Sequence, residues 1–414
     1  PGELATVLDD ARPRLVLTTG DGVALPGPAV RLGGAEGPAW LRSGETVTDA
    51  ELAAARDRVE PGDPAALVHT SGSSGRPKGA LLPHRALVRC ALVQGTHVLD
   101  PGIPPVVVNN LPVNHVACLG DVTAAVLVAG GTVVLQDRFD PPRVLAALGR
   151  ERVTVWGGVP AMFALCVADP AFATADLSSV RRIVTGGGPM PLPLARALTE
   201  RGPRLVNLYG LTETVGNVTF TGPDDDLATI TGTIGRPDPR YRVDVVRPDG
   251  SLCADGEVGE IRVGGDARMT GYLGRPEATA AAFDSRGRLR SGDLAHRRTD
   301  GALVLAGRLS ERFKSGGYNV DPREVEEVLE RHPGVRLAAV VGVPDPLYGE
   351  VGHAFVAADP AARGTRVTAE SLRTHARAHL ANYKVPKRIE VRPELPLLAV
   401  GKVDKIRLRQ EVRS

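Results

Sequence analysis

"RLVNLYG", residues 204–210, is a short run of mostly apolar residues that ends at a glycine. Two runs of the same kind precede it, "VTVWGGVP" at 153–160 and "RRIVTGGG" at 181–188. Each has the length of a strand that is buried on both faces of a parallel sheet. Helical patterns lie before and between them at 141–151 and 192–202. This alternation predicts an α/β sheet, in which ligands gather at the carboxyl ends of the strands.

Two earlier runs, "RLVLTT" at 14–19 and "AALVHT" at 65–70, follow the same pattern and are predicted to be strands of the same buried, parallel kind. The pattern changes after residue 230. The stretch "YRVDVVRPDGSLCADGEVGEIRV" at 241–263 predicts antiparallel hairpins, with turns at Asp249-Gly250 and Asp255-Gly256.

The last hundred or so residues alternate helix and strand patterns, which predicts a small α+β domain. We therefore divide the chain into a large domain at 1–309, whose part at 230–309 is rich in antiparallel strands, and a small domain at 310–414. The chain starts at Pro1 rather than at methionine, and we expect that part of the natural N-terminus is absent.

Composition excludes several classes of protein. The net charge is +2 with scattered basic residues, and aromatic residues make up 4%. A nucleic-acid-binding protein needs a basic patch or a surface of stacking rings, so nucleic acid is not an expected partner. The four cysteines form no C-x-x-C pair, which argues against a zinc site and favours reduced thiols in the cytoplasm. No apolar run is long enough to span a bilayer, and no signal peptide is visible.

The loop "TSGSSGRPKG", residues 70–79, has the composition of a phosphate site. Glycines let backbone N–H groups approach an anion closely, and hydroxyls with the ammonium of Lys78 complete the site. The alternative is a surface hairpin, which also favours Ser, Gly and Pro. A kinase-type phosphate loop is disfavoured, because Lys78 is followed by Gly79 and not by a Ser or Thr that would bind Mg²⁺.

The stretch "NLYGLTET", residues 207–214, also stands at the end of a predicted strand. Glu213 would suit Mg²⁺, which prefers one or two carboxylates together with phosphate oxygens. Thr212 would hydrogen-bond a phosphate, and Tyr209 offers a ring for stacking. The alternative is a helix N-cap. "TGGGPM", at 185–190, would let a flat base lie against bare backbone, or is simply a turn.

Five motifs occur together in a specific order: "SGSSGRPKG", "NLYGLTET", "SGDL", "GRLSERFKSGGYNVDPREVE" and "PLLAVGKVDK". On these motifs the chain resembles the adenylate-forming superfamily of acyl-CoA synthetases, aryl-CoA ligases and peptide-synthetase adenylation domains. The resemblance implies a large domain of layered α/β sheets with a small β-barrel-like part, followed by a small mobile C-terminal domain. It also implies that the N-terminus is truncated relative to the family.

The resemblance implies that ATP and a carboxylate give an acyl-adenylate and pyrophosphate, after which a thiol displaces AMP. Lys402 would bridge the carboxylate and the α-phosphate, Thr212 would touch the α-phosphate, and Glu213 would hold Mg²⁺. Asp293 and Arg308 would bind the ribose hydroxyls, although turn chemistry and a surface ion pair are the alternatives. The β- and γ-phosphate loop would comprise Thr70, Ser71, Gly72, Ser73, Ser74, Gly75 and Lys78, and the other nucleotide contacts Gly187, Gly188, Asn207, Tyr209 and Gly210.

The acyl pocket is implied by "LPVNHVACLGD", residues 111–121. Here His115 would lie near the carboxylate, with a core histidine as the alternative. Asp121 is better explained as the cap of the following helix than as a partner for an amino group. Small residues would leave room for an aryl or medium acyl chain; the predicted lining is His115, Val159, Gly186, Gly188, Val215 and Gly216.

The thiol step is assigned by resemblance to a second loop, Lys314, Ser315, Gly316 and Gly317, which would enter the site as Lys402 leaves. Asp321-Pro322 is predicted to cap the helix that follows. The hinge position is Ser310, where relatives usually carry Asp or Lys. Without the other motifs, Lys402 would be better explained as a solvated lysine in a Gly-Lys turn.

We therefore predict a cytoplasmic acid–thiol ligase that uses ATP and Mg²⁺, with coenzyme A as the leading acceptor. Its partner is a small-molecule carboxylate, and the chain is predicted to be a monomer or homodimer. One alternative keeps adenylation but passes the acyl group to a carrier-protein thiol, an amine or another nucleophile. A second alternative, of another class, is a non-catalytic module that binds a nucleotide or acyl-adenylate.

Overall fold

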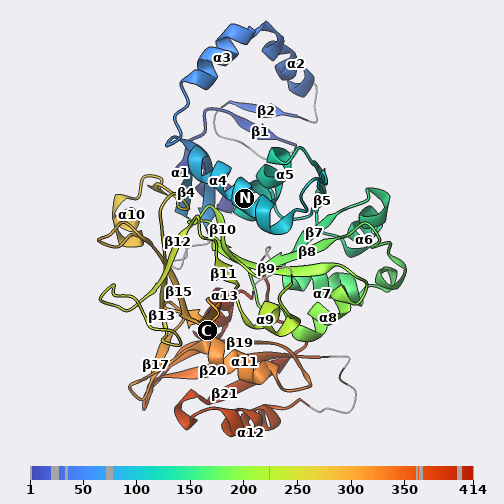
Figure 1. Cartoon of the computed structure of the whole chain (residues 1–414). Helices are drawn as coiled ribbons and strands as arrows, with labels where there is room; N and C mark the ends of the chain where they lie inside the picture. The colour runs from blue at the N-terminus through green and yellow to red at the C-terminus, as the bar shows by residue number, and fades with distance from the viewer. Residues whose placement is uncertain are drawn as a thin grey trace.

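The computed structural model describes residues 2–19, 28–32, 36–70, 78–222, 224–359, 362, 367–398 and 403–413. Its centre is a seven-stranded sheet ordered β11-β10-β9-β8-β7-β5-β6 (Figure 1). The strands are β5 (Val106–Asn109), β6 (Thr132–Leu135), β7 (Val155–Gly158), β8 (Arg182–Gly186), β9 (Arg204–Leu211), β10 (Gly216–Phe220) and β11 (Arg236–Pro237). Strands β5 to β9 run parallel, and β10 and β11 extend one edge antiparallel. The predicted α/β sheet is confirmed.

Helices cover both faces of this sheet. Successive strand residues point to opposite faces, and Val107 and Val108 of β5 accordingly belong to two different cores, as do Val155 and Trp156 of β7. The core that includes Trp156 is covered by α6 (Pro141–Arg150), α7 (Pro160–Ala168), η3 (Pro170–Thr174), α8 (Leu192–Thr199) and α9 (Leu227–Gly232). The other core is covered by α4 (His84–Val98), η2 (Ala117–Ala124) and α5 (Ala125–Val128).

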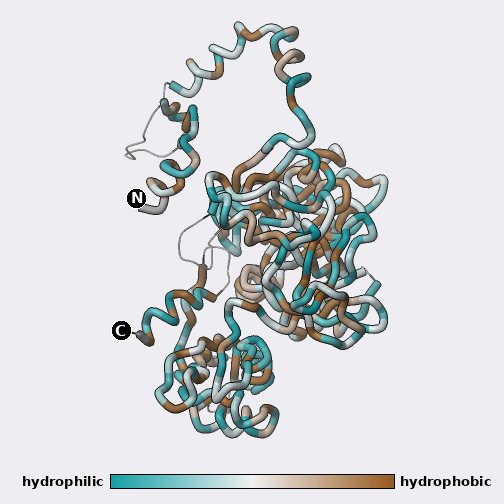
Figure 2. Tube along the Cα trace, turned by 90° about the vertical axis from the view of Figure 1, so that its left-hand side faces the viewer, coloured by the Kyte–Doolittle hydropathy of each residue, from teal (hydrophilic) through white to brown (hydrophobic). Residues whose placement is uncertain are grey.

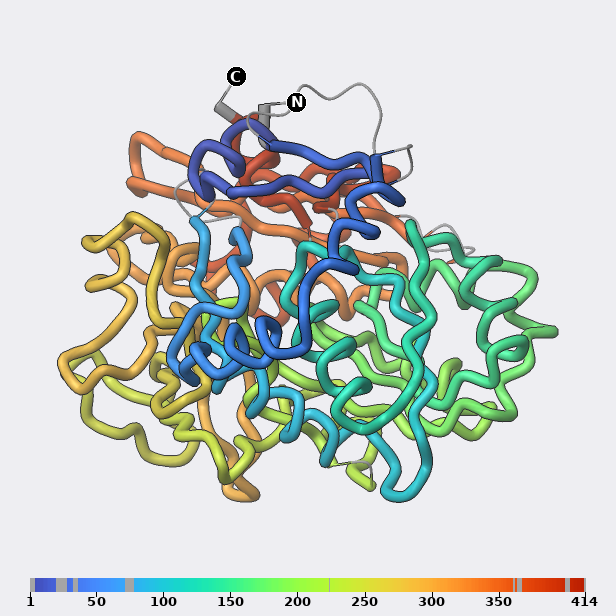
Figure 3. Tube along the Cα trace, turned by 90° about the horizontal axis from the view of Figure 1, so that it is seen from above, coloured from blue at the N-terminus to red at the C-terminus, as the bar shows by residue number. Residues whose placement is uncertain are grey.

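Two antiparallel sheets lie beside the central sheet, as the yellow and green halves of Figure 3 show from above. One is β12 (Arg242–Val246), β13 (Gly259–Gly264), β15 (Leu289–Arg297) and β16 (Leu303–Arg308), and the other is β14 (Gly271–Tyr272), β4 (Lys78–Pro83) and β3 (Pro64–Thr70); α10 (Pro276–Ala282) follows β14. The predicted antiparallel hairpin is confirmed, because β12 pairs antiparallel with β13. Gly250 and Gly256 take φ of +85° and +79° in the turns between them.

The first fifty-odd residues form an arm above the body in Figure 1, and Figure 2 shows the arm arching away from it. Its elements are α1 (Gly2–Ala11), β1 (Val16–Thr18), β2 (Ala29–Arg31), α2 (Glu36–Ser43), η1 (Gly44–Thr46) and α3 (Asp49–Asp57). The run at 14–19 was predicted to be a buried strand, and this is wrong: β1 pairs in parallel with β2 in a separate two-stranded sheet and is half-exposed. The run at 65–70 is β3, which pairs antiparallel with β4 and is also partly exposed. An apolar run predicts a strand, but it does not reveal which sheet the strand joins.

The C-terminal residues form the predicted α+β unit, which is the lowest part of Figure 1. A sheet ordered β18-β17-β20-β19, with β21 added beside β20, carries helices on both faces. The elements are β17 (Phe313–Ser315), β18 (Tyr318–Val320), α11 (Pro322–Glu330), β19 (Val335–Asp345), β20 (Gly349–Ala358), α12 (Ala369–His379), η4 (Asn382–Lys384), β21 (Arg388–Arg392) and α13 (Lys405–Arg413). Among the helices that the structure describes, none has the length and apolar character needed to cross a bilayer.

Candidate active site

Three strands, two of them consecutive and the third far away in the sequence, meet at the carboxylate of Asp293. Asp293 lies on β15, and the residue opposite it on β16 is Arg308. Arg308 Nε donates a hydrogen bond of 2.5 Å to Asp293 Oδ1. The hydroxyl of Tyr209, on β9 of the central sheet, donates one of 2.7 Å to Asp293 Oδ2. The structure therefore brings together the two residues predicted for the ribose and the ring predicted for the base.

Burial and nearby charges keep the two donors of this cluster, Tyr209 and Arg308, protonated. Tyr209 is 8% exposed and Asp293 is 4% exposed. Burial, reinforced by the charge of Asp293, raises the pKa of Tyr209 well above its ordinary value, so the hydroxyl stays a hydrogen-bond donor. Burial opposes the charge of the Arg308 guanidinium, but the attraction of Asp293 outweighs it and raises the pKa of Arg308. Asp293 thus holds the Tyr209 hydroxyl and the Arg308 guanidinium in place near the carboxyl end of β9.

Strand β9 ends in a tight turn, residues 211–216, which carries Thr212 and Glu213. The hydroxyl of Thr214 holds this turn together: it accepts the N–H of Leu211 at 2.7 Å and lies 2.7 Å from the carbonyl oxygen of Gly216. The predicted N-cap alternative does not apply, because β10 follows the turn and pairs antiparallel with β9. The turn presents Thr212 and Glu213 at the carboxyl end of a parallel strand.

The same turn contains a conformation that a β-branched residue rarely adopts. Val215 has a φ of +62° and is fully buried. Gly216 follows with a φ of +137°, and a Cβ there would lie 2.4 Å from both Asp121 Oδ1 and Cys90 Sγ. Backbone in this region is typically strained by about 1–3 kcal/mol and is found at functional sites. The neighbouring side chains thus force one shape on the turn.

Tyr272, which sequence reasoning missed, connects this turn to the phosphate-loop strand. Its hydroxyl donates a hydrogen bond of 2.8 Å to Glu213 Oε1. The Lys78 Nζ lies 5.4 Å from the centre of the same ring. Tyr272 stands opposite Ala80 in the β14–β4 ladder, so the main chain fixes the ring between the two functional residues. The only sequence signal was an aromatic residue next to glycine, which is too common to predict a site.

The loop between β3 and β4 is only partly described. Ser71, Gly72, Ser73, Ser74 and Gly75 lie outside the described residues. Thr70 and Lys78 on either side stand opposite each other in an antiparallel ladder. The segment therefore connects two antiparallel strands, as the surface-hairpin alternative expected. A kinase-type loop instead connects a strand to the N-terminus of a helix, so this arrangement argues against a kinase.

The residues predicted for the nucleotide base lie around the ends of β8 and β9. Gly187 has a φ of +76°, and a Cβ on Gly188 would make only ordinary van der Waals contact, with Pro160 at 3.9 Å, so this backbone is not crowded. Thr185, just before them, is buried, and its hydroxyl has no hydrogen-bond partner among the described residues. A ligand at the end of β8 would fit both observations.

Asn207 and Gly210, which were also predicted to contact the nucleotide, instead make contacts within the protein. The Asn207 amide nitrogen donates to the carbonyl oxygens of Ile230 and Thr233, at 3.1 and 2.8 Å, and ties β9 to α9. A Cβ on Gly210 would lie 2.0 Å from the carbonyl oxygen of Gly216. Both residues thus hold β9 against its neighbours.

The predicted acyl-pocket residues are only partly open. His115 is half-buried before η2, and its Nδ1 accepts the N–H of Ala117 at 3.2 Å. Val159 is the residue before α7. A Cβ on Gly186 would lie 2.8 Å from the Leu208 carbonyl oxygen, so this glycine allows β8 and β9 to pack. Of the three glycines predicted to leave room, only Gly188 could carry a Cβ without a close contact.

The cap predicted at Asp121 is wrong. The residue lies inside η2, a π-helical stretch whose N-cap is Val116. Asp121 Oδ1 instead accepts the N–H of Asn217 at 3.2 Å and the thiol of Cys90 at 3.4 Å. Burial is the largest influence on this carboxyl and raises the pKa of Asp121 to about 7. π-Helical turns often mark functional segments, and this one places an acid directly behind the turn that carries Glu213.

The predicted thiol-step loop is a two-residue hairpin turn. Ser315 pairs with Tyr318 across β17 and β18, and Gly316 and Gly317 between them take φ of +58° and +86°. Two positive φ values in a two-residue hairpin favour glycine. Lys314 is exposed, and Ser315 is buried.

In the small domain, the helix cap predicted at Asp321 is wrong. Asp321 precedes α11 as predicted, but its carboxylate makes two bonds of 2.8 Å to Arg312 instead of capping the helix. Ser310, the predicted hinge, is exposed between β16 and β17. Lys402 lies outside the described residues. Nearby, Lys405 Nζ binds Glu326 at 2.8 Å and also Glu311.

The residues present fit a magnesium ion of the kind that is shared with phosphate. Glu213 is a partly exposed carboxylate at a strand end. In the part of the chain that the structure describes, no group of three or more His, Cys, Asp or Glu residues could enclose a metal. Mg²⁺ is usually held by one or two carboxylates, several waters and substrate phosphates, without a protein cage. Glu213 would supply the protein ligand.

The sequence matches the AMP-binding enzyme family over residues 1–273 and the AMP-binding enzyme C-terminal domain over residues 324–402. The chain belongs to the AMP-binding enzymes. This confirms the resemblance to the adenylate-forming superfamily that the five motifs indicated.

Relatives of this AMP-binding enzyme are CoA ligases. It is 42% identical to a feruloyl-CoA synthase of Amycolatopsis sp. over 348 residues, which are 84% of this chain and 69% of that enzyme. It is 36% identical to a sulfoacetate–CoA ligase of Cupriavidus necator over 416 residues, 99% of this chain and 80% of that enzyme. These relatives confirm the prediction of an acid–thiol ligase of the acyl-CoA synthetase type.

Solved structures agree with the fold. ATP-bound MatB from Rhodopseudomonas palustris superimposes with a TM-score of 0.88 at 28% identity, covering 100% of this chain and 82% of that one. The amide bond synthetase McbA from Marinactinospora thermotolerans gives 0.81 at 32% identity, covering 99% of this chain and 78% of that one. The predicted fold class, a large α/β domain followed by a small C-terminal one, is confirmed.

Proposed function

We propose that this AMP-binding enzyme activates a small carboxylic acid with ATP and transfers the acyl group to coenzyme A. The observation that carries the proposal is the convergence of Tyr209, Asp293 and Arg308 from three separate strands. Inside the hydrophobic core, a carboxylate that already accepts hydrogen bonds from an aromatic hydroxyl and a guanidinium would find no further hydrogen-bond partner. At a strand end, it suits the hydroxyls of a nucleotide sugar.

In the first step a carboxylate oxygen attacks the α-phosphorus, and the bond to pyrophosphate breaks. Negative charge builds up on the phosphorus, so fixed cations and donors lower the barrier most. Lys402 would lie at the reacting carboxylate and α-phosphate, and Thr212 would donate to the α-phosphate. Lys78, with Thr70 and the serines and glycines of 71–75, would bind the departing phosphates. When bound at Glu213, Mg²⁺ would neutralise phosphate charge.

In the second step the thiol of coenzyme A attacks the acyl carbon, and AMP leaves. We propose that the boundary near residue 309 separates two moving parts. Rotation at Ser310 would exchange Lys402 for the loop at 314–317. Serine carries no charge there, so the hinge residue itself can form no ion pair that favours one of the two positions.

The acid is proposed to be an aryl or medium-length acyl carboxylate. At the end of β8, a Cβ on Gly188 would make only ordinary van der Waals contact with Pro160, while the positions at Gly186 and Gly216 are filled by their neighbours. The pocket would therefore extend past Gly188 and Val159, with His115 at its side. A relative that makes feruloyl-CoA supports the aryl choice. Four free cysteines, three of them buried, suit the reducing cytoplasm that we propose as its location.

A second candidate differs in the acceptor. McbA, an amide bond synthetase, has 32% identity and the same fold, so an amine is a specific rival to coenzyme A. A carrier-protein thiol is the other rival. Transfer from adenylate to amine would need the same first step.

The test separates the steps. Pyrophosphate exchange with a panel of aryl and acyl acids should detect adenylation, and Lys402→Ala should lower its rate by about 10²–10³-fold. Absence of exchange with every acid would overturn adenylation and favour a binding module. AMP release that rises with coenzyme A supports the proposed acceptor. Release that responds only to amines would support the amide candidate instead.

A further inference from the structure

Strand β15 is interrupted by a bulge at the residue that binds Tyr209 and Arg308. Glu260 of β13 stands opposite Leu294, and Arg262 stands opposite Arg290. A single residue of β13, Ile261, therefore faces the three residues 291–293. Bulges beside active sites re-aim a side chain. Here the bulge determines where the Asp293 carboxylate points.

The bulge is held by hydrogen bonds on both sides. The Ser291 hydroxyl donates to the Ile261 carbonyl oxygen at 2.7 Å and accepts the Asp293 N–H at 3.0 Å. The Gly292 carbonyl oxygen accepts the N–H of Leu309 at 2.8 Å. The Gly292 N–H donates to Glu260 Oε1 at 3.3 Å. Gly292 has a φ of +71°, which glycine adopts about as readily as a negative φ, so this side-chain contact selects one of several accessible conformations.

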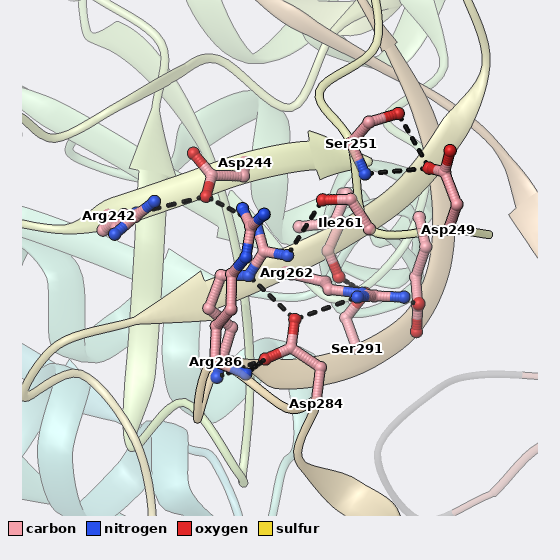
Figure 4. Close-up of polar contacts among 12 residues, drawn as sticks. Arg242, Asp244, Asp249, Ser251, Ile261, Arg262, Asp284, Arg286 and Ser291 are labelled. Atoms are coloured by element: carbon pink, nitrogen blue, oxygen red, sulfur yellow. Dashed lines mark hydrogen bonds and ion pairs between the residues drawn. The ribbon is translucent and has the colours of Figure 1, made fainter. Parts of the chain in front are cut away.

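The other oxygen of Glu260 is committed to a buried chain of charges. Arg262 Nε donates to Glu260 Oε2 at 3.0 Å, and Arg262 Nη1 donates to Asp284 Oδ2 at 2.9 Å. Arg288 continues the chain from Asp284 to Asp244, at 2.8 and 3.0 Å. Figure 4 shows Asp244, Arg262 and Asp284 of this chain of charges together with Ile261 and Ser291 of the bulge.

This chain of charges restrains Glu260. Glu260 is 8% exposed and Arg262 is 4% exposed. Breaking a buried pair by removing one partner is strongly unfavourable, because it leaves the other charge unpaired. Glu260 therefore cannot turn away from Arg262, and its Oε1 stays beneath Gly292.

We propose that Glu260 is a positioning residue for recognition of the nucleotide sugar. It holds the 291–293 bulge so that Asp293 meets Tyr209 and Arg308 in the geometry that binds the ribose hydroxyls. This inference rests on the proposed function, since it takes Asp293 as the ribose ligand. Glu260 itself touches no substrate.

The test compares ATP with 2′-deoxyATP and 3′-deoxyATP in pyrophosphate exchange, measured well below the melting temperature of each protein. The natural chain should prefer ATP by about tenfold or more, the value of a hydrogen bond to a charged group. Glu260→Ala should lose most of this preference while its rate with deoxyATP stays within about twofold of the natural chain. Glu260→Gln keeps one acceptor oxygen for two donors, and its preference should fall between the two.

Asp244→Asn is the matched control, because Asp244 belongs to the same chain of charges but does not contact the bulge. It should lower the melting temperature and leave the preference unchanged. If Glu260→Ala does not fold, Glu260→Gln decides. An unchanged preference in whichever variant folds overturns the proposal. A natural chain that exchanges with ATP and deoxyATP equally well would overturn the ribose assignment of Asp293 itself, and with it this inference.

Discussion

The hydroxyl of Tyr272 donates a hydrogen bond of 2.8 Å to the carboxylate of Glu213, and the two residues are 59 positions apart in the chain. The ring of Tyr272 also lies beneath the ammonium of Lys78. One side chain thus links the residue proposed for Mg²⁺ to the lysine proposed for the departing phosphates. Burial and the nearby Glu213 raise the pKa of Tyr272, so the hydroxyl remains a donor.

Tyr272→Phe should raise the Mg²⁺ concentration needed for half-maximal exchange. Groups that orient a metal ligand typically contribute about 10–100-fold to metal affinity. A Mg²⁺ titration of the exchange rate measures the effect, and we expect a rise of about tenfold. Tyr383→Phe removes a phenol hydroxyl of the small domain, in η4, and serves as the control. Identical titrations for Tyr272→Phe and the natural chain would contradict a role in metal binding.

Asp293→Asn should weaken the use of ATP. The change removes the charge that Arg308 and Tyr209 both bind, and bonds to charged groups contribute about 1.5–3 kcal/mol each. We expect kcat/KM for ATP to fall by about 10–100-fold, mainly through KM. Steady-state kinetics at saturating acid measure it. Asp224→Asn changes a carboxylate whose side chain is 81% exposed and should have no effect. Equal kinetics for both variants would remove Asp293 from the site.

Lys402→Ala should separate the two half-reactions. Removing one donor that acts on the developing charge typically lowers the rate by about 10²–10³-fold. Pyrophosphate exchange should fall by this factor. Thioester formation from a supplied acyl-adenylate and coenzyme A should remain within about threefold, because the lysine is proposed to act only in the first step. If both reactions fell equally, Lys402 would have a general structural role.

The stability of the chain should depend on pH through Asp121. Its pKa is about 7 in the folded chain, and about 3.9 is usual for an unfolded Asp. Between these values the folded chain binds more protons than the unfolded one. The stabilising contribution of Asp121 is therefore fully present below about pH 4 and is lost as pH rises through 7. The free energy of unfolding should fall by up to about 1.4 kcal/mol per pH unit at the steepest point.

Urea unfolding of the natural chain and of Asp121→Asn at pH 5, 6, 7 and 8 checks this. The variant cannot titrate at this position, so its stability should change less over the window. If the unfolding free energies of the two proteins changed in parallel with pH, Asp121 would already be ionised at pH 5.

Patterns local in sequence predicted most of the fold. Strands β7, β8 and β9 followed from their apolar runs, because strands buried on both faces must be apolar throughout, and helices α6 and α8 followed from their helical patterns. The placements of β1 and β3 could not be predicted in this way. Their runs look the same as the buried ones, and pairing depends on residues far away in the chain.

The site divides along the same line. Asp293, Arg308 and Tyr209 stand in recognisable motifs, and the structure brings them together. Tyr272 and Glu260 carry no local signal, since each acts through a partner that is distant in the sequence. Asp121 was misassigned because its position before an apolar run suits a helix cap, whereas the actual helix already begins at Ala117.

The buried turn at Val215 has a consequence for how substrate range can change. Gly120 of η2 lies so close to the turn that a Cβ there would stand 3.2 Å from the Val215 carbonyl oxygen. The helix proposed to line the acyl pocket and the loop that carries Glu213 therefore share one contact surface. Enlarging a side chain of η2 to suit a smaller acid would press on the catalytic loop. New specificities in this enzyme should consequently arise through paired substitutions, one on η2 and a compensating one near residue 215.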